Sequence, residues 1–433
     1  MNSCPALLIA APASGQGKTT FTAALARYHR NQGRKVRVFK TGPDFLDPMI
    51  LERASGYPVY QLDLWMVGEQ SCKQQLYEAA AEADIILIEG VMGLFDGNPS
   101  SADLAELFGI PVLALIDASA MAQTFGAIAH GLAHYRPDIP FAGVVANRVA
   151  SQGHGDMLAE SLPETVHYFG GLLRNEKITL PERHLGLVQA AEVEDLEKRI
   201  NQAAELIKQT TLTTLPEKIN FSKEESAKID TLLKGVSIGV ARDTAFAFIY
   251  PANIDLLIKM GAELIYFSPL KDNSIPDVDA LWLPGGYPEL HLNELENNTS
   301  MSRSIQQHHK NNNPILAECG GMLYLLDSLT DKENNKAKMA GIIPGEGIMQ
   351  QKLAGLGMQS MELNGRKVTA HTFHHSTMTT TLKPVTHGIR QRGKNPGEAV
   401  YHDKNLIATY LHLYFASNPE FIAQLFKPVK THE

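Results

Sequence analysis

A short apolar run, a glycine-bearing loop and a helix-forming segment constrain this chain more than any other part of its sequence. Residues 7–9 are a candidate strand, residues 10–20 read Ala-Ala-Pro-Ala-Ser-Gly-Gln-Gly-Lys-Thr-Thr, and residues 21–26 begin a helix. Phosphate binds in such a context because backbone N–H groups converge on its oxygens and the helix dipole adds to the attraction. The sequence therefore predicts a nucleotide site at this strand-to-helix turn.

Two side chains of this loop have distinct predicted roles. Lys18 is expected to reach the outer phosphates, and the Thr19 hydroxyl is expected to hold Mg2+. The strict pattern has glycine five residues before Gly17, where this chain has Pro12. A glycine/serine turn followed by an unrelated lysine is the alternative, and the flanking strand and helix speak against it. The predicted nucleotide-binding set is Gly15, Gly17, Lys18, Thr19 and Thr20.

Length, charge and cysteine count narrow the class of protein. A chain of 433 residues predicts two or three domains, and a net charge of -8 gives no reason to expect nucleic acid or an anionic membrane as a partner. The N-terminus lacks the pattern of a signal peptide, and no apolar run approaches the ~18 residues of a membrane span. The 3 cysteines are too few and too scattered for a disulfide framework or a thiolate metal site. We therefore expect a cytoplasmic enzyme with reduced thiols.

Acidic residues follow the next predicted strands. Open parallel sheets bind their ligands beyond the carboxyl ends of the strands. A lone aspartate is more often a helix cap or turn former, but four acids that each follow a strand, together with a P-loop, predict metal or substrate binding. They are Asp44 and Asp47 after the strand at 35–40, Glu89 at the end of the strand at 84–90, and Asp96 in the loop 91–97.

Strands that alternate with helical segments predict the organisation of the chain. Further strands at 111–117 and 141–148 indicate a doubly wound parallel sheet. Asn147 ends the second of these and is a candidate for base recognition, with a simple turn role equally open. Residues 193–207 then have helical apolar spacing, and a polar stretch follows them. The expected domains are a P-loop domain at 1–190, a helical and polar linker at 191–234, and a second α/β domain at 235–433.

A cysteine lies at another predicted strand-to-helix turn. Residues 315–326 read Ile-Leu-Ala-Glu-Cys-Gly-Gly-Met-Leu-Tyr-Leu-Leu, with Cys319 at the turn. Small neighbours permit the strained backbone of a nucleophile, and a helix N-terminus lowers the pKa of a thiol. A buried structural cysteine is the alternative, but flanking glycines are a poor choice for packing a small hydrophobic side chain. The sequence thus predicts Cys319 as a nucleophile.

A nucleophilic thiol requires a base and an acceptor site for developing charge. Only a few per cent of a free thiol is ionised at pH 7, and His412, after the last predicted strand, is the candidate base. The pair Gly285-Gly286 ends another strand and exposes backbone N–H groups. These groups suit an oxyanion hole, for which we predict Gly286 and Gly320.

The two sites together resemble a known family. The C-terminal half is similar to class I glutamine amidotransferase domains, which have a flavodoxin-like fold, and the N-terminal half resembles dethiobiotin synthetase and other P-loop amidoligases. Their combination is similar to the cobyrinate (or hydrogenobyrinate) a,c-diamide synthases of cobalamin biosynthesis, from about Leu7 to Phe415. The motifs that carry this resemblance are at 89–97 (Glu-Gly-Val-Met-Gly-Leu-Phe-Asp-Gly), 239–243, 285–290 and 317–322.

This resemblance implies a reaction and its partners. ATP would phosphorylate a carboxylate of the corrinoid, and ammonia from glutamine would attack the acyl phosphate, so that the a and c acetate side chains become amides. The resemblance leaves open whether two copies of this chain form a homodimer. The residues implied are Asp44 and Glu89 with Thr19 in the Mg2+ shell, Asp47 and Asp96 at the substrate or its intermediate, and Lys40 at the transferring phosphoryl group, where charge and positioning carry the reaction.

The chain departs from the related patterns in two places. Amidotransferases with a full triad have glutamate two residues after the histidine, where this chain has Tyr414, so His412 lacks that orienting carboxylate. The pattern His-Glu-Phe-His-Tyr-Ser appears at 371–376 with Thr372 and His375 as the changed residues. Metal ligation by His371, His374 and His375 is a competing idea, less favoured because no acid or cysteine joins them.

Two other functions remain as alternatives. One is a related tetrapyrrole amidase, either a cobyric acid synthase or a nickel-sirohydrochlorin a,c-diamide synthase. The short chain and the acids at Asp44 and Asp47 favour the a,c-diamide synthase of the corrin series. The other is a nucleotide-switched partition or scaffold ATPase with a degenerate second domain, against which the Cys319 and His412 pair speaks.

Overall fold

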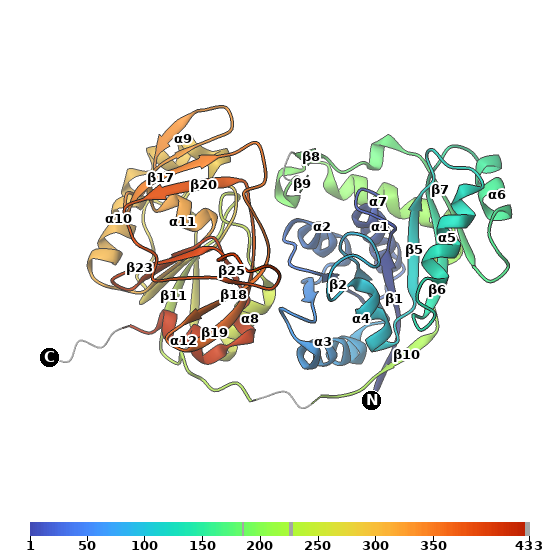
Figure 1. Ribbon diagram of the computed structural model, residues 1–433, viewed down its shortest axis with the longest axis horizontal. Coiled ribbons are helices and arrows are strands. Elements are labelled where there is room, and N and C mark those ends of the chain that lie inside the picture. Colours follow the sequence, from blue (N-terminus) through green and yellow to red (C-terminus); the bar gives the residue numbers. More distant parts are fainter. Residues whose placement is uncertain (184–185, 225–227, 429–433) are drawn as a thin grey trace. The chain divides into compact units, whose positions relative to one another are not determined.

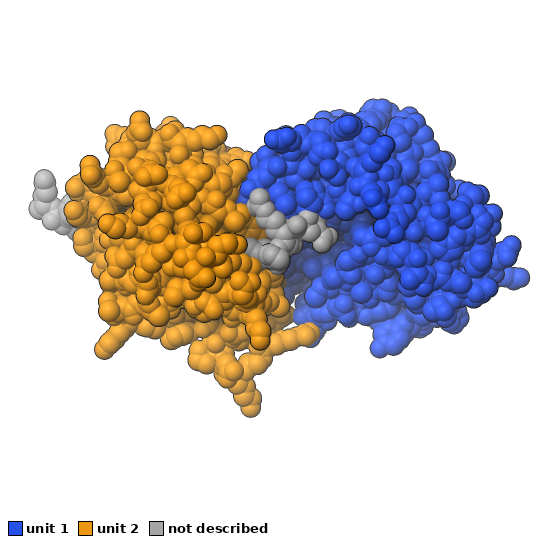
Figure 2. Space-filling model, turned by 90° about the horizontal axis from the view of Figure 1, so that it is seen from above, with its two compact units in different colours: residues 1–226 blue, residues 227–433 orange. Residues whose placement is uncertain are grey.

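The chain forms two compact units. The computed structural model describes residues 1–183, 186–224 and 228–428. Unit 1 comprises Met1–Ser226 and unit 2 comprises Ala227–Glu433 (Figure 2). Within the described part of the chain, no helix has the length and apolar character needed to cross a membrane.

Unit 1 consists of parallel strands and helices that alternate along the chain (Figure 1). Its strands are β1 (Asn2–Ala10), β2 (Val36–Thr41), β3 (Tyr60–Leu62), β4 (Ile85–Glu89), β5 (Val112–Asp117), β6 (Phe141–Val149), β7 (Tyr168–Leu173), β8 (Glu182–Arg183), β9 (Gly186–Leu187) and β10 (Lys218–Phe221). Its helices are α1 (Lys18–Asn31), α2 (Leu46–Ser55), α3 (Glu69–Glu82), α4 (Ser101–Phe108), α5 (Thr124–His134), α6 (Gln152–Glu160) and α7 (Leu196–Leu206). Short 3-10 turns are η1 (Glu176–Ile178), η2 (Ala190–Glu192), η3 (Ile207–Gln209) and η4 (Thr211–Thr213).

The main sheet of unit 1 has the order β3-β2-β4-β1-β5-β6-β7. All neighbours in this order are parallel, and β10 pairs antiparallel with the start of β1. The strands β1, β4 and β5 are buried almost throughout, as expected for parallel strands covered on both faces. The predicted doubly wound sheet is confirmed, and the carboxyl ends of β1, β2 and β4 lie side by side at one edge, where such sheets bind ligands.

The P-loop turn between β1 and α1 depends on a glycine. Gly17 has φ 89, a left-handed conformation that favours glycine. A Cβ at this position would lie 2.6 Å from Nδ2 of Asn147. The close approach of β6 to the loop therefore leaves no room for a side chain, and Lys18 and Thr19 begin α1 directly after it.

The segment expected to be a linker is instead largely part of unit 1. Leu196, Ile200 and Ala203 of α7 are buried in one apolar cluster with Phe21 and Leu25 of α1. The strand β10 continues the same unit through its pairing with β1. Apolar spacing indicates which face of a helix is buried but not what covers it, and so the spacing did not identify α1 as the partner.

Unit 2 is a second α/β unit. Its strands are β11 (Ser237–Ala241), β12 (Glu263–Phe267), β13 (Ala280–Leu283), β14 (Ile315–Glu318), β15 (Leu326–Thr330), β16 (Lys336–Lys338), β17 (Ile343–Met349), β18 (Gly355–Leu363), β19 (Arg366–His374), β20 (Ser376–Thr380), β21 (Thr386–His387), β22 (Ile389–Arg390), β23 (Ala399–Asp403), β24 (Leu406–Thr409) and β25 (His412–Leu413). Its helices are α8 (Pro251–Lys259), α9 (Leu292–Asn297), α10 (Thr299–Lys310), α11 (Gly320–Tyr324) and α12 (Pro419–Phe426), with 3-10 turns η5 (Pro288–His291) and η6 (Phe415–Ser417).

The central sheet of unit 2 has the order β12-β11-β13-β14-β24-β23-β21. The first five strands in this order are parallel, β23 is antiparallel to β24, and β21 is in turn antiparallel to β23. Two smaller sheets, β16-β15-β17-β20 and β22-β18-β19-β25, have no counterpart among the strands predicted from sequence. Because β13, β14 and β24 are parallel neighbours, the loops that follow them begin at one edge of the sheet.

Candidate active site

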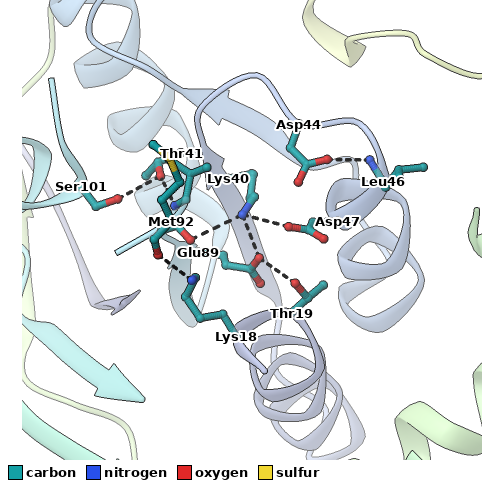
Figure 3. Close-up of polar contacts among 12 residues, drawn as sticks. Lys18, Thr19, Lys40, Thr41, Asp44, Leu46, Asp47, Glu89, Met92 and Ser101 are labelled. Carbon is teal, nitrogen blue, oxygen red and sulfur yellow. Dashed lines mark hydrogen bonds and ion pairs between the residues drawn. The ribbon is translucent and has the colours of Figure 1, made fainter. Parts of the chain in front are cut away.

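Lys18 and Thr19 of the P-loop lie together with Asp44, Asp47 and Glu89 at the carboxyl ends of the neighbouring strands β1, β2 and β4 (Figure 3). Lys18 Nζ donates to the backbone oxygens of Met92 at 2.6 Å and Ala13 at 3.3 Å. Thr19 Oγ1 donates to Glu89 Oε1 at 3.1 Å. The first turn of α1 is therefore in direct contact with the carboxyl end of β4.

A buried lysine connects two of the acids. Lys40 and Glu89 face each other in the register of β2 and β4. Lys40 Nζ lies 2.9 Å from Glu89 Oε1 and 3.0 Å from Asp47 Oδ2, the latter at the start of α2. The Lys40 side chain is 2% exposed and that of Glu89 0%. The structure thus brings Lys40, Asp47 and Glu89 into one ion cluster, with Asp44 held nearby by the N–H of Leu46 at 2.9 Å.

Burial and mutual charge shift every group of this cluster. Burial alone lowers the pKa of Lys40, but the charges of Glu89 and Asp47 outweigh it and raise that pKa. Burial raises the pKa of Asp47, and Lys40 more than reverses this, to a pKa of about 2. Burial raises the pKa of Glu89, and burial together with the charge of Asp47 raises that of Asp44. Three carboxyl groups thus share one lysine, and burial favours the protonated forms of Glu89 and Asp44.

The side-chain oxygens of Thr19, Glu89 and Asp44 fit a Mg2+ ion that binds together with a nucleotide. Glu89 Oε2 is buried and accepts no hydrogen bond from the residues that the structure describes. Within the same residues, no three His, Cys, Asp or Glu side chains form a group that could hold a metal ion. Mg2+ is commonly held by one or two carboxylates together with phosphate oxygens and water. Thr19 and Glu89, with Asp44 beside them, match that kind of partial site.

A cavity of about 750 Å³ opens above the cluster within unit 1. Its lining includes the P-loop residues together with Lys40, Asp44, Asp47 and Glu89. Apolar side chains from α1, β7, η1 and α7 also line it, namely Phe21, Ala24, Leu172, Ile178 and Leu206, together with the polar Arg174, Asn175 and Glu176. This combination suits a molecule with a charged phosphate end and a flat apolar end, which is the shape of a nucleotide.

Asn147, the candidate for base recognition, has a different set of contacts. Its Nδ2 donates to the backbone oxygen of Gln16 at 2.8 Å, and its Oδ1 accepts from the N–H of Arg148 at 3.0 Å. The amide thus holds the P-loop backbone, although Asn147 also lines the cavity. These contacts favour support of the P-loop over base recognition.

Asp96 belongs to the loop 91–97, whose Met92 backbone oxygen accepts the hydrogen bond from Lys18. Asp96 is exposed, and its Oδ2 accepts from the N–H of Gly93 at 2.8 Å. The N–H of Val91 donates to Thr41 Oγ1 at 2.8 Å, so β2 holds the start of the loop. The hydroxyls of Thr41 and Ser101 lie 3.1 Å apart. Sequence reasoning assigned no role to these two hydroxyls, because Ser and Thr at element ends are common.

Removal of the Lys40 charge is expected to destabilise unit 1. In Lys40→Met, Glu89 and Asp47 would remain buried beside each other without their cation, and such a change costs about 3–5 kcal/mol. Urea unfolding followed by a probe in unit 1 measures the loss. The exposed Lys35 is the matched control, since Lys35→Met should change stability by less than ~0.5 kcal/mol. Equal stability of the two variants would contradict a buried ion cluster.

Cys319 of unit 2 lies at a strained turn between β14 and α11. Its φ is 46, a left-handed conformation that costs a residue with a side chain of the order of 1–3 kcal/mol. Its N–H donates to the backbone oxygen of Thr409 at 2.7 Å, which joins the turn to the end of β24. A sharp turn of this kind presents a side chain at the edge of the sheet, as in other nucleophile turns.

His412, the predicted base, and the Gly285-Gly286 loop lie at the same edge of the sheet. A Cβ on Gly285 would lie 2.3 Å from Cε1 of His412, and a Cβ on Gly320 would lie 2.9 Å from the backbone nitrogen of Gly286. His412 is 2% exposed. The structure therefore brings together four predicted residues of this site, which are Cys319, His412, Gly286 and Gly320.

The thiol and the imidazole are both held in their neutral forms. Burial, followed by the charge of Glu289, raises the pKa of Cys319. Burial, followed by the charges of His371 and His374, lowers the pKa of His412. A neutral imidazole is the form that accepts a proton, so His412 is in the state needed to take the thiol proton when a substrate arrives.

The other histidines contact protein groups around this pair. The His371 ring stacks on that of His412 at 5.2 Å, and its Nδ1 lies 3.1 Å from the Tyr250 hydroxyl. His374 stacks on Tyr410 at 3.7 Å. His374 Nε2 also lies 3.3 Å from Glu398 Oε1. The two histidines are in β19, whereas their partners lie before α8, before β23, directly after β24 and in β25, and so sequence separation concealed these contacts.

Comparison with known proteins supports the two-part description. Residues 7–188 match the CobQ/CobB/MinD/ParA nucleotide binding domain family, and residues 237–420 match the CobB/CobQ-like glutamine amidotransferase domain family. The fold and the two sites thus define a P-loop nucleotide-binding domain joined to a glutamine amidotransferase domain. The α/β fold class predicted from sequence is confirmed.

Full-length relatives specify the family. The chain is 58% identical to the hydrogenobyrinate a,c-diamide synthase of Stutzerimonas stutzeri, over 98% of this chain and 99% of the relative. It is 56% identical to the protein of the same name from Pseudomonas aeruginosa, over 99% and 98%. It is 48% identical to the cobyrinate a,c-diamide synthase of Herminiimonas arsenicoxydans, also over 99% and 98%. The chain belongs to the cobyrinate and hydrogenobyrinate a,c-diamide synthase family.

Proposed function

We propose that this chain catalyses the ATP- and glutamine-dependent amidation of the a and c acetate carboxylates of cobyrinate or hydrogenobyrinate. One observation carries the proposal. A P-loop with a buried lysine–carboxylate cluster occurs in one chain with a strained cysteine and a buried histidine that share the Gly285-Gly286 loop, and this chain matches these synthases over 98% of its length. A scaffold ATPase has no use for the second site.

The P-loop unit would activate the corrinoid carboxylate. Lys18 would exchange its contacts with backbone oxygens for the outer phosphates of ATP. Mg2+, held by Thr19 and Glu89 with Asp44 nearby, would neutralise phosphate charge. A carboxylate oxygen of the corrinoid would attack the γ-phosphorus of ATP, and the bond from this phosphorus to the β-phosphate oxygen would break. The products are an acyl phosphate of the corrinoid and ADP.

Charged groups beside the P-loop would position this transfer. Lys40 is the cation of the buried cluster and lines the cavity, so its charge would stabilise the transferring phosphoryl group. Asp47, beside Lys40, and the exposed Asp96 would orient the corrinoid or its acyl phosphate. Ammonia then attacks the acyl carbon, the bond to the phosphate oxygen breaks, and the amide forms as inorganic phosphate leaves.

The amidotransferase unit would supply the ammonia. Cys319 Sγ attacks the carboxamide carbon of glutamine while His412 takes the thiol proton. The N–H groups of Gly286 and Gly320 would bind the oxyanion. His412 returns the proton to the departing nitrogen, ammonia leaves, and water hydrolyses the thioester to glutamate.

A direct assay tests this function. The full chain is incubated with ATP, Mg2+ and glutamine and with either cobalt-bearing or cobalt-free corrinic acid. Glutamate release, ADP formation and the mass of the corrinoid are then followed. Two successive amide substitutions are expected with at least one substrate, and omission of Mg2+ should stop them. Nucleotide hydrolysis without any change in corrinoid mass would support the scaffold ATPase and contradict the proposal.

A methyl group on Gly285 is expected to disrupt the glutaminase step. In Gly285→Ala the added carbon would overlap His412 Cε1 at 2.3 Å, so the imidazole must move. A misplacement of a catalytic group by about 1 Å costs about 100-fold in rate, so we expect a loss of that order in glutamine hydrolysis. Synthesis from ammonia should be unchanged. The control is Gly131→Ala in α5, where an added Cβ meets nothing within 4 Å. Glutamate release at the normal rate in Gly285→Ala would show that His412 is not the base.

A further inference from the structure

The residue before the nucleophile is a buried glutamate to which neither the sequence nor the proposed mechanism assigns a role. Glu318 ends β14, and it is 2% exposed. Its neighbours on this strand, Ile315, Leu316 and Ala317, are apolar and buried. Burial of a carboxyl group in such surroundings costs free energy unless hydrogen-bond donors satisfy its oxygens. The donors that Glu318 finds therefore show what its side chain does.

Both oxygens of Glu318 accept a hydrogen bond from a different strand. Oε1 accepts from the backbone N–H of Leu413 at 2.8 Å. Oε2 accepts from the indole N–H of Trp282 at 2.8 Å. Leu413 immediately follows His412 in β25, and Trp282 lies in β13, which leads into the Gly285-Gly286 loop.

The carboxylate therefore joins the three segments on which glutamine hydrolysis would depend. Its own backbone continues into Cys319, one oxygen holds the segment with His412, and the other holds the strand that leads to Gly286. The β14–β24 register, in which Glu318 faces Thr409, brings β14 beside the strand that precedes His412.

We propose that Glu318 is a positioning residue of the amidotransferase site, which sets His412 and the Gly285-Gly286 backbone relative to Cys319. This inference rests on the proposed glutamine hydrolysis. Glu318 acts through the backbone beside His412 and not on the ring itself. A carboxylate thereby restricts the position of His412, although this chain has Tyr414 where full-triad amidotransferases have the orienting glutamate.

A carboxylate is suited to this position because both incoming groups are donors. A glutamine side chain has one acceptor oxygen and one NH2 group, so one of the two donors would face another donor. The expected result is a shift of His412 or of the glycine loop rather than a loss of the fold. Glutamine binding requires neither group to be placed as accurately as the reaction does.

The test compares Glu318→Gln with the wild-type chain in glutamine hydrolysis and in amidation from ammonia. We expect kcat for glutamate release to fall about 10-fold or more while KM for glutamine stays within about two-fold, since misplacement acts on the reacting geometry. Amidation from ammonia should stay within about two-fold of wild type. Trp282→Phe, which removes one donor and keeps the bond to Leu413, should lower kcat less than Glu318→Gln does.

Asp279→Asn is the matched control. Asp279 accepts hydrogen bonds from the N–H and hydroxyl of Ser237 at the amino ends of β11 and β13, away from Cys319. It should leave kcat for glutamate release unchanged. Should Glu318→Gln fail to fold, the kcat and KM of Trp282→Phe decide in its place.

The outcomes separate this inference from the proposed function. A wild-type chain without Cys319-dependent glutamate release overturns the proposed function and this inference with it. A wild-type chain that hydrolyses glutamine, together with a folded Glu318→Gln variant of unchanged kcat, overturns the positioning role alone. A rise in KM at unchanged kcat also overturns it, because the carboxylate would then act in binding.

Discussion

Cys319→Ala is expected to abolish amidation from glutamine while amidation from ammonia continues. The thiol is the only group at the strained turn that can form the covalent intermediate, and loss of a nucleophile lowers kcat by at least ~1,000-fold. Lys18, Lys40 and the acids of unit 1 are untouched by the change. Ammonium chloride at alkaline pH therefore supplies the nitrogen directly, and the corrinoid mass and glutamate release report the two reactions separately.

Cys72→Ala is the control for the loss of a buried thiol. Cys72 is a free, buried cysteine of α3 in unit 1, far along the chain from the turn at Cys319. This variant should retain both nitrogen sources. Equal loss of glutamine- and ammonia-dependent synthesis in Cys319→Ala would refute the assignment of two separate sites.

Lys18→Ala is expected to abolish amidation from both nitrogen sources. The lysine would bind the outer phosphates, and removal of such a charge from a phosphoryl-transfer site lowers the rate on the order of 1,000-fold. Glutamine hydrolysis measured alone should continue, because Cys319 and His412 belong to unit 2. ADP formation, corrinoid mass and glutamate release distinguish these effects.

The exposed lysine at position 35 serves as the control for charge. Lys35→Ala removes one positive charge from unit 1 at a site outside the nucleotide cavity, and it should leave amidation unchanged. Normal amide formation in Lys18→Ala would rule out the phosphate role of the P-loop lysine.

Local patterns in the sequence predicted much of the fold and the kind of site. The Gly-Lys-Thr loop between a strand and a helix predicted the nucleotide-binding domain. Apolar runs located β1, β2, β4, β5 and β6 of unit 1 and β11 to β14 of unit 2, but not β3, β7, β21, β23 or β24. Cys319, followed by two glycines at a strand-to-helix turn, predicted the strained backbone that its φ of 46 confirms. These features depend on neighbouring residues, so a single chain segment contains the information.

Other features of the same sites were outside the reach of sequence reasoning. The spacing at 193–207 predicted a helix, and this helix was assigned to a linker. In the structure it packs against α1 within unit 1. Asn147 was a candidate for base recognition, whereas its amide contacts the P-loop backbone. The small sheet β22-β18-β19-β25, whose strand β19 contains both His371 and His374, was absent from the expected strands.

The sequence alone determined the two chemistries of this protein, because a phosphate loop and a nucleophile turn are each encoded within about a dozen consecutive residues. Only the tertiary structure decided how distant side chains cooperate. The register of β2 with β4 placed Lys40 against Glu89, and the pairing of β14 with β24 placed Glu318 within reach of Leu413. Strand order and register arise from long-range packing, which adjacent residues do not specify.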